Sequence, residues 1–190
     1  YQAVQQEGGI CEIDPEIWFR AMERGICRIL EKQDKSLVHG IGVTGQMHTL
    51  IVVGEDGQAV RPAIMWNDTR TKDLLPALKE KIQGFPDGDY LSRTISTGSP
   101  AANLYWMKQY EPENLKKIRK FLIGPDYLVY RLTGVSVTDF CEASTSCLYR
   151  ICEKEWSEEM KNLIGLSWEV YPEIRGSAQS AGRLLPKLCE

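Results

Sequence analysis

The strongest signal in this chain is the stretch Gly40-Ile41-Gly42-Val43-Thr44-Gly45-Gln46-Met47-His48. Its first residues read as an apolar, glycine-containing β-strand, and three ligand-capable side chains follow at once: Gln46, Met47 and His48. In an open α/β sheet, ligands bind at the carboxyl ends of the strands. Gln and His can hydrogen-bond hydroxyl groups, while Met supplies an adaptable apolar wall. The stretch therefore predicts a strand ending at Gln46, with a small-ligand pocket beyond it.

A second stretch repeats this arrangement a short distance along the chain. The apolar run Pro62-Ala63-Ile64-Met65 is followed directly by Trp66-Asn67-Asp68-Thr69-Arg70. Between the two stretches, Glu55-Asp56-Gly57 is a hairpin-type turn, flanked by the apolar segments 50–53 and 59–65. Two polar clusters at two strand ends favour a pocket for a sugar or another small polyhydroxy ligand.

Each of these residues also has a purely structural interpretation. His48 on its own could satisfy backbone groups at a strand end, and Trp66 could pack in the core. Asp68 could pair with Arg70 as an ion pair that fixes the loop. Residue types alone leave these alternatives open.

The bulk properties restrict the class of protein. The 190 residues suffice for one domain with a sizeable core, and 43% hydrophobic with 26% charged content is typical of a globular protein. With a net charge of -3, the chain lacks the excess of basic residues that is typical of proteins binding nucleic acid or an anionic membrane. No apolar stretch has membrane-spanning length and the first seven residues do not resemble a signal peptide, so we expect a cytoplasmic protein.

The spacing of the cysteines does not indicate a set of disulfide bonds or a metal site. The six cysteines contain no C-x-x-C pair, and only two histidines could assist a metal site. We therefore expect buried free thiols and no bound metal. The cysteines are Cys11, Cys27, Cys141, Cys147, Cys152 and Cys189.

Alternating helical and strand-like segments predict an α/β fold with mixed sheet pairing. Asp14-Pro15 is a strong helix start, and Gly134 and Gly165 are positioned to end helices. Residues 83–100 are rich in Gly, Pro, Ser and Asp and are predicted to be mostly loop. Further helices are predicted from residue 69 onward and over 101–110, 114–119, 125–132 and 157–164, with a short buried strand at 121–123.

Taken together, these motifs resemble the FGGY carbohydrate kinases, and within them the xylulokinase branch. The resemblance rests on Thr44-Gly45-Gln46-Met47-His48 and on Arg61-Pro62-Ala63-Ile64-Met65-Trp66-Asn67-Asp68-Thr69-Arg70-Thr71. Flanking matches extend it over almost the whole chain. They are Gly9 with Glu12 and Asp14-Pro15, then Pro125-Asp126-Tyr127-Leu128, Arg131-Leu132-Thr133-Gly134, Thr138-Asp139-Phe140 and Ala143-Ser144.

The resemblance implies a ribonuclease-H-like (actin-like ATPase) α/β fold, with a mixed sheet flanked by helices. Residues 1–190 would form part of an amino-terminal domain, one incomplete lobe of a two-lobe kinase. The family's first β-hairpin and its carboxy-terminal nucleotide-binding domain have no counterpart in the sequence. The implied activity is transfer of the ATP γ-phosphate to a sugar hydroxyl, with D-xylulose as first choice. ATP and Mg would serve the complete enzyme, with neither expected on this fragment; a homodimer is implied by analogy only.

The resemblance also implies roles for the site residues. Met47 and His48 would contact the sugar, and Trp66 would form an apolar wall. Gln46, Asn67 and Asp68 would orient the pocket or touch sugar hydroxyls.

No catalytic residue is assigned, because the family's catalytic aspartate lies beyond the position matching Glu190. Neither a G-x-x-x-x-G-K-[ST] loop nor a G-x-G-x-x-G element is present to bind phosphate. Asp126 is interpreted as a first-turn charge complementing a helix dipole, and Asp139 as a residue that stabilises the loop after it.

One departure from the family bears on the substrate. In relatives, several residues separate the segment matching Thr97-Gly98-Ser99-Pro100 from the next helix, whereas here Trp106 follows almost directly. Because that loop lines the sugar site in relatives, a kinase for gluconate, ribulose or a polyol is the nearest alternative. A non-catalytic sugar-binding module is a second. We expect the 190-residue polypeptide to be inactive alone.

Overall fold

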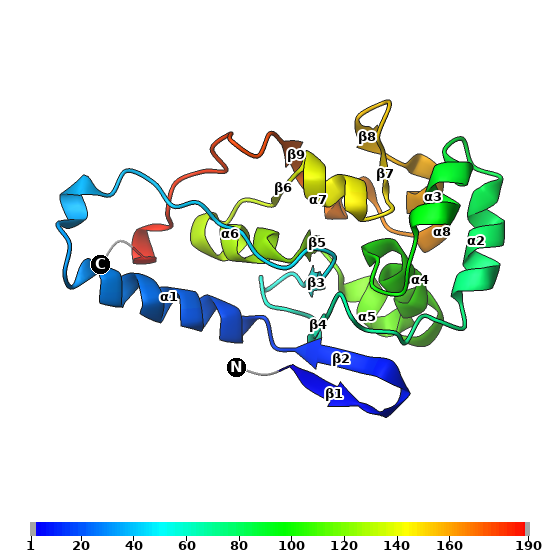
Figure 1. Cartoon of the computed structure of the whole chain (residues 1–190), viewed down its shortest axis with the longest axis horizontal. Coiled ribbons are helices and arrows are strands. Elements are labelled where there is room, and N and C mark those ends of the chain that lie inside the picture. Colours follow the sequence, from blue (N-terminus) through cyan, green and yellow to red (C-terminus); the bar gives the residue numbers. More distant parts are fainter. Residues whose placement is uncertain (1–2, 189–190) are drawn as a thin grey trace.

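An antiparallel five-stranded sheet forms the framework of the computed structural model, which describes residues 3–188 (Figure 1). Its strands lie in the order β1 (Val4–Gln6), β2 (Ile10–Ile13), β4 (Ala63–Ile64), β3 (Leu50–Val53) and β5 (Lys120–Ile123). Two further sheets have two strands each. They pair β6 (Val137–Asp139) with β9 (Glu173–Arg175) in parallel, and β7 (Tyr149–Arg150) with β8 (Glu155–Trp156) antiparallel. Both kinds of pairing occur, as predicted, but in separate sheets, so the main sheet is antiparallel and not mixed.

The helices are unevenly distributed about this framework. In Figure 1, α2, α3, α4, α5 and α8 gather at one end, while α1 and α6 extend toward the other. Their bounds are α1 Glu16–Leu30, α2 Leu75–Gln83, α3 Gly88–Thr94, α4 Pro100–Tyr110, α5 Pro112–Lys117, α6 Pro125–Thr133, α7 Phe140–Thr145 and α8 Glu158–Ile164.

Strand β3, which lies between β4 and β5, divides the core into two hydrophobic clusters. Successive side chains of a strand point to opposite faces of the sheet. Leu50 and Val52 accordingly belong to the larger cluster, which contains residues of α2, α3, α4 and α8. Ile51 and Val53 belong to the smaller cluster with Tyr127 of α6. All four strand residues are buried, so β3 is packed on both faces.

The residues predicted to start or end helices are found at helix ends in the structure. The Asp14 carboxylate accepts a hydrogen bond from the Glu16 backbone N–H at 3.0 Å, which caps the start of α1. Gly134 and Gly165 end α6 and α8 with φ of 75° and 90°, a left-handed conformation that favours glycine. These predicted helix boundaries are confirmed.

The predicted strand over residues 40–46 is wrong. This segment is an extended, mostly exposed stretch that joins no sheet of the described residues. Cavities of about 940 Å³ and 480 Å³ lie beside it, and both are lined by residues 41–45. A strand requires a neighbour that accepts its backbone hydrogen bonds, and here apolar patterning occurs without such a neighbour.

The loop predicted over residues 83–100 is also partly wrong, because it contains α3. Gly88 allows this helix to pack closely, since a Cβ at that position would collide with the backbone carbonyl of Ile82 in α2. Glycine therefore serves helix packing here. Helix α2 itself begins at Leu75 and not near residue 69, because residues 70–74 form turns.

The described cysteines are free, as predicted, but only Cys11 and Cys147 are buried. Cys27, Cys141 and Cys152 are exposed, which corrects the expectation of buried thiols, and Cys189 lies outside the described residues. Among residues 3–188, no helix has the length and apolar character needed to cross a membrane.

Candidate functional site

Three chain segments leave the main sheet at the same end. Leu50, the first residue of β3, pairs with Ile64 of β4 on one side and with Ile123 of β5 on the other. Because all three strands are antiparallel neighbours, the residues before Leu50 lie beside those after Ile64 and Ile123. The register thus brings residues 46–49, 65–68 and 124–126 together, and these include every predicted site residue.

Gly124 allows two of these segments to touch. Its φ is 43°, and a Cβ at this position would collide with the backbone carbonyl of Gln46. The Gly124 backbone N–H also donates to the Thr49 carbonyl at 2.8 Å. Only glycine combines this conformation with so close a backbone approach. Sequence inspection missed Gly124, although its place between a buried strand and Pro125 was a usable signal.

His48 occupies a strained turn. Its φ is 64°, and the Thr49 N–H donates to the Met47 carbonyl at 2.8 Å, which describes a γ-turn centred on a residue with positive φ. For a residue other than glycine, such a conformation costs about 1–3 kcal/mol and occurs often at functional sites. The surrounding structure must therefore hold His48 in place.

The imidazole of His48 has an unsatisfied nitrogen atom. Its Nε2 atom is buried without a hydrogen-bond partner among the described residues. Burial lowers the pKa of His48 below its ordinary value, so the ring is neutral at neutral pH. A neutral imidazole can donate from one nitrogen and accept at the other, which suits a hydroxyl group.

Met47 and Trp66 provide apolar surface at the same end of the sheet. Their exposed fractions are 53% and 49%, high values for such large apolar side chains. The Trp66 backbone is fixed by Gly98, where a Cβ would collide with the Trp66 carbonyl. Residues 97–99 lead straight into α4, so this turn packs on the Trp66 backbone while the indole stays half exposed.

Asp68 is buried completely, and its carboxylate is engaged by the protein. It accepts hydrogen bonds from the Cys11 backbone N–H at 2.6 Å and from the Arg70 side chain at 2.7 and 2.9 Å. Arg70 also pairs with Glu12 of β2 and lies 4.8 Å from the ring centre of Trp106 in α4. The structural ion pair that the sequence left open is present. Asn67 and Gln46 are exposed, and whether they contact a sugar stays a prediction.

Asp126 differs from its sequence interpretation. It lies in the first turn of α6 but is buried, and its Oδ2 atom accepts from the Ile123 backbone N–H at 3.2 Å, outside the helix. Burial raises the pKa of Asp126 to about 8, with smaller contributions from Glu142 and Asp139. The side chain is therefore mostly protonated at neutral pH and does not act as a dipole-complementing charge. Asp139 caps α7 by accepting from the Glu142 N–H at 2.9 Å, so it stabilises the segment that follows it, but that segment is a helix and not the predicted loop.

Comparison with known proteins identifies the family. The profile of the FGGY family of carbohydrate kinases, N-terminal domain, matches residues 1–190. A xylulose kinase from Staphylococcus xylosus is 34% identical over 188 residues, covering 99% of this chain and 39% of the relative. The chain thus spans about two fifths of the length of the curated relatives it matches.

Solved structures agree with the sequence comparison. A ligand-bound xylulose kinase from Lactobacillus acidophilus has a TM-score of 0.88 at 25% identity, over 99% of this chain and 38% of that one. A glycerol kinase from Plasmodium falciparum, solved with ADP, has a TM-score of 0.80 at 26% identity, over 99% and 39%. The predicted actin-like ATPase fold is confirmed by these neighbours. The chain belongs to the FGGY family of carbohydrate kinases.

Proposed function

We propose that this chain is the sugar-binding part of an ATP-dependent kinase that phosphorylates D-xylulose. The observation that carries the proposal is the sheet end where residues 46–49 and 65–68 meet. These segments carry the half-exposed side chains of Trp66 and Met47 and the neutral imidazole of His48, whose Nε2 atom has no hydrogen-bond partner among residues 3–188. This combination of apolar wall and hydrogen-bonding group is suited to a small polyhydroxy ligand.

Each residue has a distinct part in this proposal. Trp66 and Met47 cover the C–H surface of the sugar, and His48 Nε2 hydrogen-bonds a hydroxyl group. The amides of Gln46 and Asn67 bind further hydroxyls. Asp68 orients the pocket, because its carboxylate fixes the segment that carries Trp66 and Asn67.

ATP supplies the phosphoryl group in such kinases, and a divalent metal ion would neutralise the charge on the phosphate oxygens. Residues 3–188 contain no group of three or more His, Cys, Asp or Glu arranged to hold a metal ion. The sequence also lacks the glycine-rich loop that wraps phosphates in P-loop proteins. The described residues therefore do not fit either group, and their contribution is to bind and orient the sugar.

Calorimetric titration of the chain with sugars tests the proposal. We expect D-xylulose to bind more tightly than D-ribulose, gluconate or glycerol. His48→Ala should weaken binding by on the order of tenfold, the loss of one buried hydrogen bond. His39→Ala is the matched control, since His39 is exposed and belongs to none of the three converging segments.

The outcomes separate the alternatives. Preferential binding of gluconate, ribulose or glycerol would indicate a kinase for that substrate, consistent with the glycerol kinase among the structural neighbours. Sugar binding by an intact gene product that never binds nucleotide would indicate a non-catalytic module. Absence of binding to all four compounds would overturn the proposal.

A further inference from the structure

Trp66 and Asn67 occupy the two central positions of one tight turn, residues 65–68, which we call the Trp66 turn. The Asp68 backbone N–H donates to the Met65 carbonyl at 3.0 Å and closes the turn. Cys11 of β2 holds both ends, because its carbonyl accepts from the Met65 N–H at 3.0 Å and its N–H donates to Asp68 Oδ2 at 2.6 Å. The orientation of the turn therefore depends on how firmly the Asp68 carboxylate is held.

Arg70 is the side chain that fastens this carboxylate. Its Nε and Nη2 atoms donate to the two carboxylate oxygens of Asp68 at 2.9 and 2.7 Å. Nη2 also donates to Oε1 of Glu12 at 2.6 Å, and the same Glu12 oxygen accepts from Arg61. One oxygen atom of Glu12 thus joins two arginines, whose side chains are only 8% and 4% exposed.

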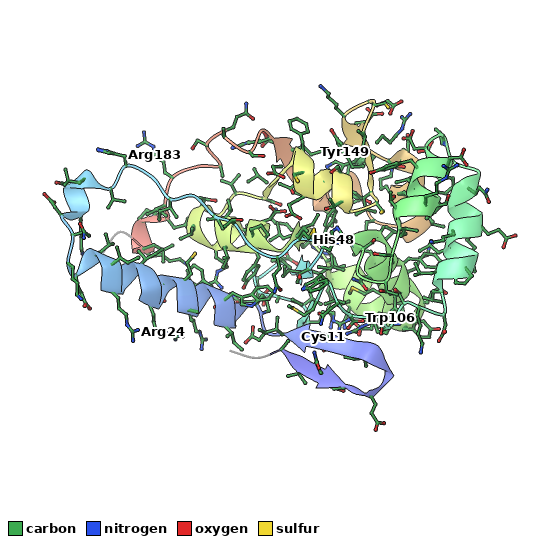
Figure 2. All side chains as sticks on the ribbon, in the orientation of Figure 1. Cys11, Arg24, His48, Trp106, Tyr149 and Arg183 are labelled. Carbon is green, nitrogen blue, oxygen red and sulfur yellow. The ribbon has the colours of Figure 1, made fainter. Side chains whose placement is uncertain are left out.

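The two guanidinium groups are neighbours, because both donate to one oxygen atom. Their central carbon atoms also lie 4.8 Å (Arg70) and 5.7 Å (Arg61) from the ring centre of Trp106 in α4. Figure 2 labels Trp106 and Cys11, which mark the α4 side and the β2 side of this region. Two like charges with so little contact with water repel one another, and the carboxylate that both of them contact offsets the repulsion.

We propose that Glu12 is a positioning residue for the sugar site, which acts through Arg70 on the Trp66 turn. As the counter-ion shared by both arginines, it keeps Arg70 paired with Asp68 and thereby keeps the indole and the Asn67 amide in their orientation. This inference rests on the proposed function, because it assigns the orientation of the same site to a residue of a different strand.

Loss of the Glu12 charge has a specific consequence. Arg61 would keep its pairing with Glu111 at 3.0 Å, and Arg70 would keep its pairing with Asp68. The two guanidinium groups would then repel one another without a shared anion, and a displaced Arg70 would carry Asp68 and the Trp66 turn with it. Removing the Arg61 charge as well would end this repulsion, so the two changes should compensate one another.

The test compares sugar affinity in variants of the intact chain. Glu12→Gln keeps the size of the side chain and removes its charge, so the dissociation constant for D-xylulose should rise by on the order of tenfold. When Arg61→Met is added, the dissociation constant should return to within about twofold of that of Arg61→Met alone. A contribution of Glu12 to packing alone would not be restored by changing a second side chain.

Asp87→Asn is the matched control. Asp87 is an acidic residue of similar exposure that pairs with Arg150 at 3.0 Å, and Arg150 also has further carboxylate partners. Asp87 belongs to none of the three converging segments, so the variant should leave sugar affinity unchanged. A loss of affinity equal to that of Glu12→Gln would overturn the inference.

A second readout needs no sugar. In ¹H–¹⁵N spectra, the indole N–H resonance of Trp66, identified by its absence in Trp66→Phe, should move in Glu12→Gln. In the double variant it should return to its position in Arg61→Met. If the parent chain binds no sugar, the proposed function fails, and this resonance still decides the role of Glu12.

Two results would overturn the inference: an unmoved Trp66 resonance in Glu12→Gln, or a double variant that behaves like Glu12→Gln. If Glu12→Gln does not fold, the double variant decides, because the inference requires it to fold and to show the Trp66 resonance of Arg61→Met.

Discussion

At the scale of single residues, the site depends on Gly124. Its positive φ and its contact with the Gln46 carbonyl permit residues 46–49 to pack on the start of α6. The same residue type is dispensable elsewhere: Gly25 lies on the exposed side of α1 with open space around it. The two glycines therefore give opposite predictions.

We predict that Gly124→Ala lowers the free energy of unfolding by roughly 2 kcal/mol or more and weakens sugar binding. The added methyl group must displace the Gln46 backbone, which carries Met47 and His48 with it. Gly25→Ala should instead stabilise the chain by about 0.5–1 kcal/mol, because alanine loses less entropy in a helix. Urea denaturation of both variants tests this, and a neutral Gly124→Ala would contradict the described packing.

Asp126 predicts a dependence of stability on pH. Its folded pKa of about 8 lies above the ordinary value of 3.8, so the folded state binds its proton more tightly than the unfolded state. The resulting stability is present at low pH and is lost as pH rises from about 4 through about 8.

Asp126→Asn should remove this loss, because the amide stays neutral and can still accept from the Ile123 N–H. Relative to the parent, the variant should gain stability progressively from pH 5 to pH 9, by at most roughly 5 kcal/mol. Denaturation at pH 5, 7 and 9 measures the gain. Asp73→Asn is the control, since Asp73 is exposed, and an equal pH trend in both variants would refute the assignment.

At the scale of elements, a buried charge network ties the Trp66 segment to its neighbours. Asp68 and Arg70 connect this segment to β2 through Cys11 and Glu12, and Arg70 packs on Trp106 of α4. Arg61 joins the same network through Glu12 and Glu111. The segment that carries Trp66 is thereby fixed against both the sheet and a helix.

Removing Asp68 should therefore be costly. Asp68→Ala leaves the Arg70 guanidinium, only 4% exposed, with a single carboxylate partner, and we expect a loss of about 3–5 kcal/mol. The exposed pair Arg93–Asp89 is the comparison: Asp89→Ala should change stability by less than about 0.5 kcal/mol. Chemical denaturation of both variants measures the difference. Similar small losses would show that the buried network contributes little.

At the scale of the whole molecule, the described residues bring together the side chains of the proposed sugar site, and no carboxylate among them is assigned as a catalytic base. Asp126, a buried carboxyl group in one of the three converging segments, is mostly protonated at neutral pH, and the buried carboxylate of Asp68 is engaged by Cys11 and Arg70. Residues 41–45 line two large cavities and join no sheet of the described residues. Binding and turnover should consequently be separable properties.

We predict that this 190-residue polypeptide binds D-xylulose but releases no ADP in a sugar-dependent manner. A coupled ADP assay with a full-length xylulose kinase as positive control measures this. Sugar-dependent ADP release by the exact polypeptide, reduced by His48→Ala, would refute the prediction and would require a base among the described residues.

Features that depend on residues close together in the sequence were predicted correctly, whereas features that depend on contacts between distant segments were not. Caps were predicted well because each acts within a few residues, as at Asp14, Gly134 and Gly165. The strand expected at residues 40–46 and the loop expected at 83–100 failed, because a strand needs a partner and Gly88 serves packing between two helices. At the proposed site, residue type drew attention to Met47, His48 and Trp66, whereas the close backbone approach at Gly124 could not be read from the sequence.

The amino-acid sequence by itself determined the family, the helix boundaries set by local caps, and the residue types proposed to bind a ligand. Only the tertiary structure decided which of these side chains meet, which are buried and which carry charge. The positive φ of His48, the complete burial of Asp68 and the raised pKa of Asp126 all arise from contacts between distant segments. Backbone strain and desolvation depend on neighbours in space, and the order of residues along a chain does not specify those neighbours locally.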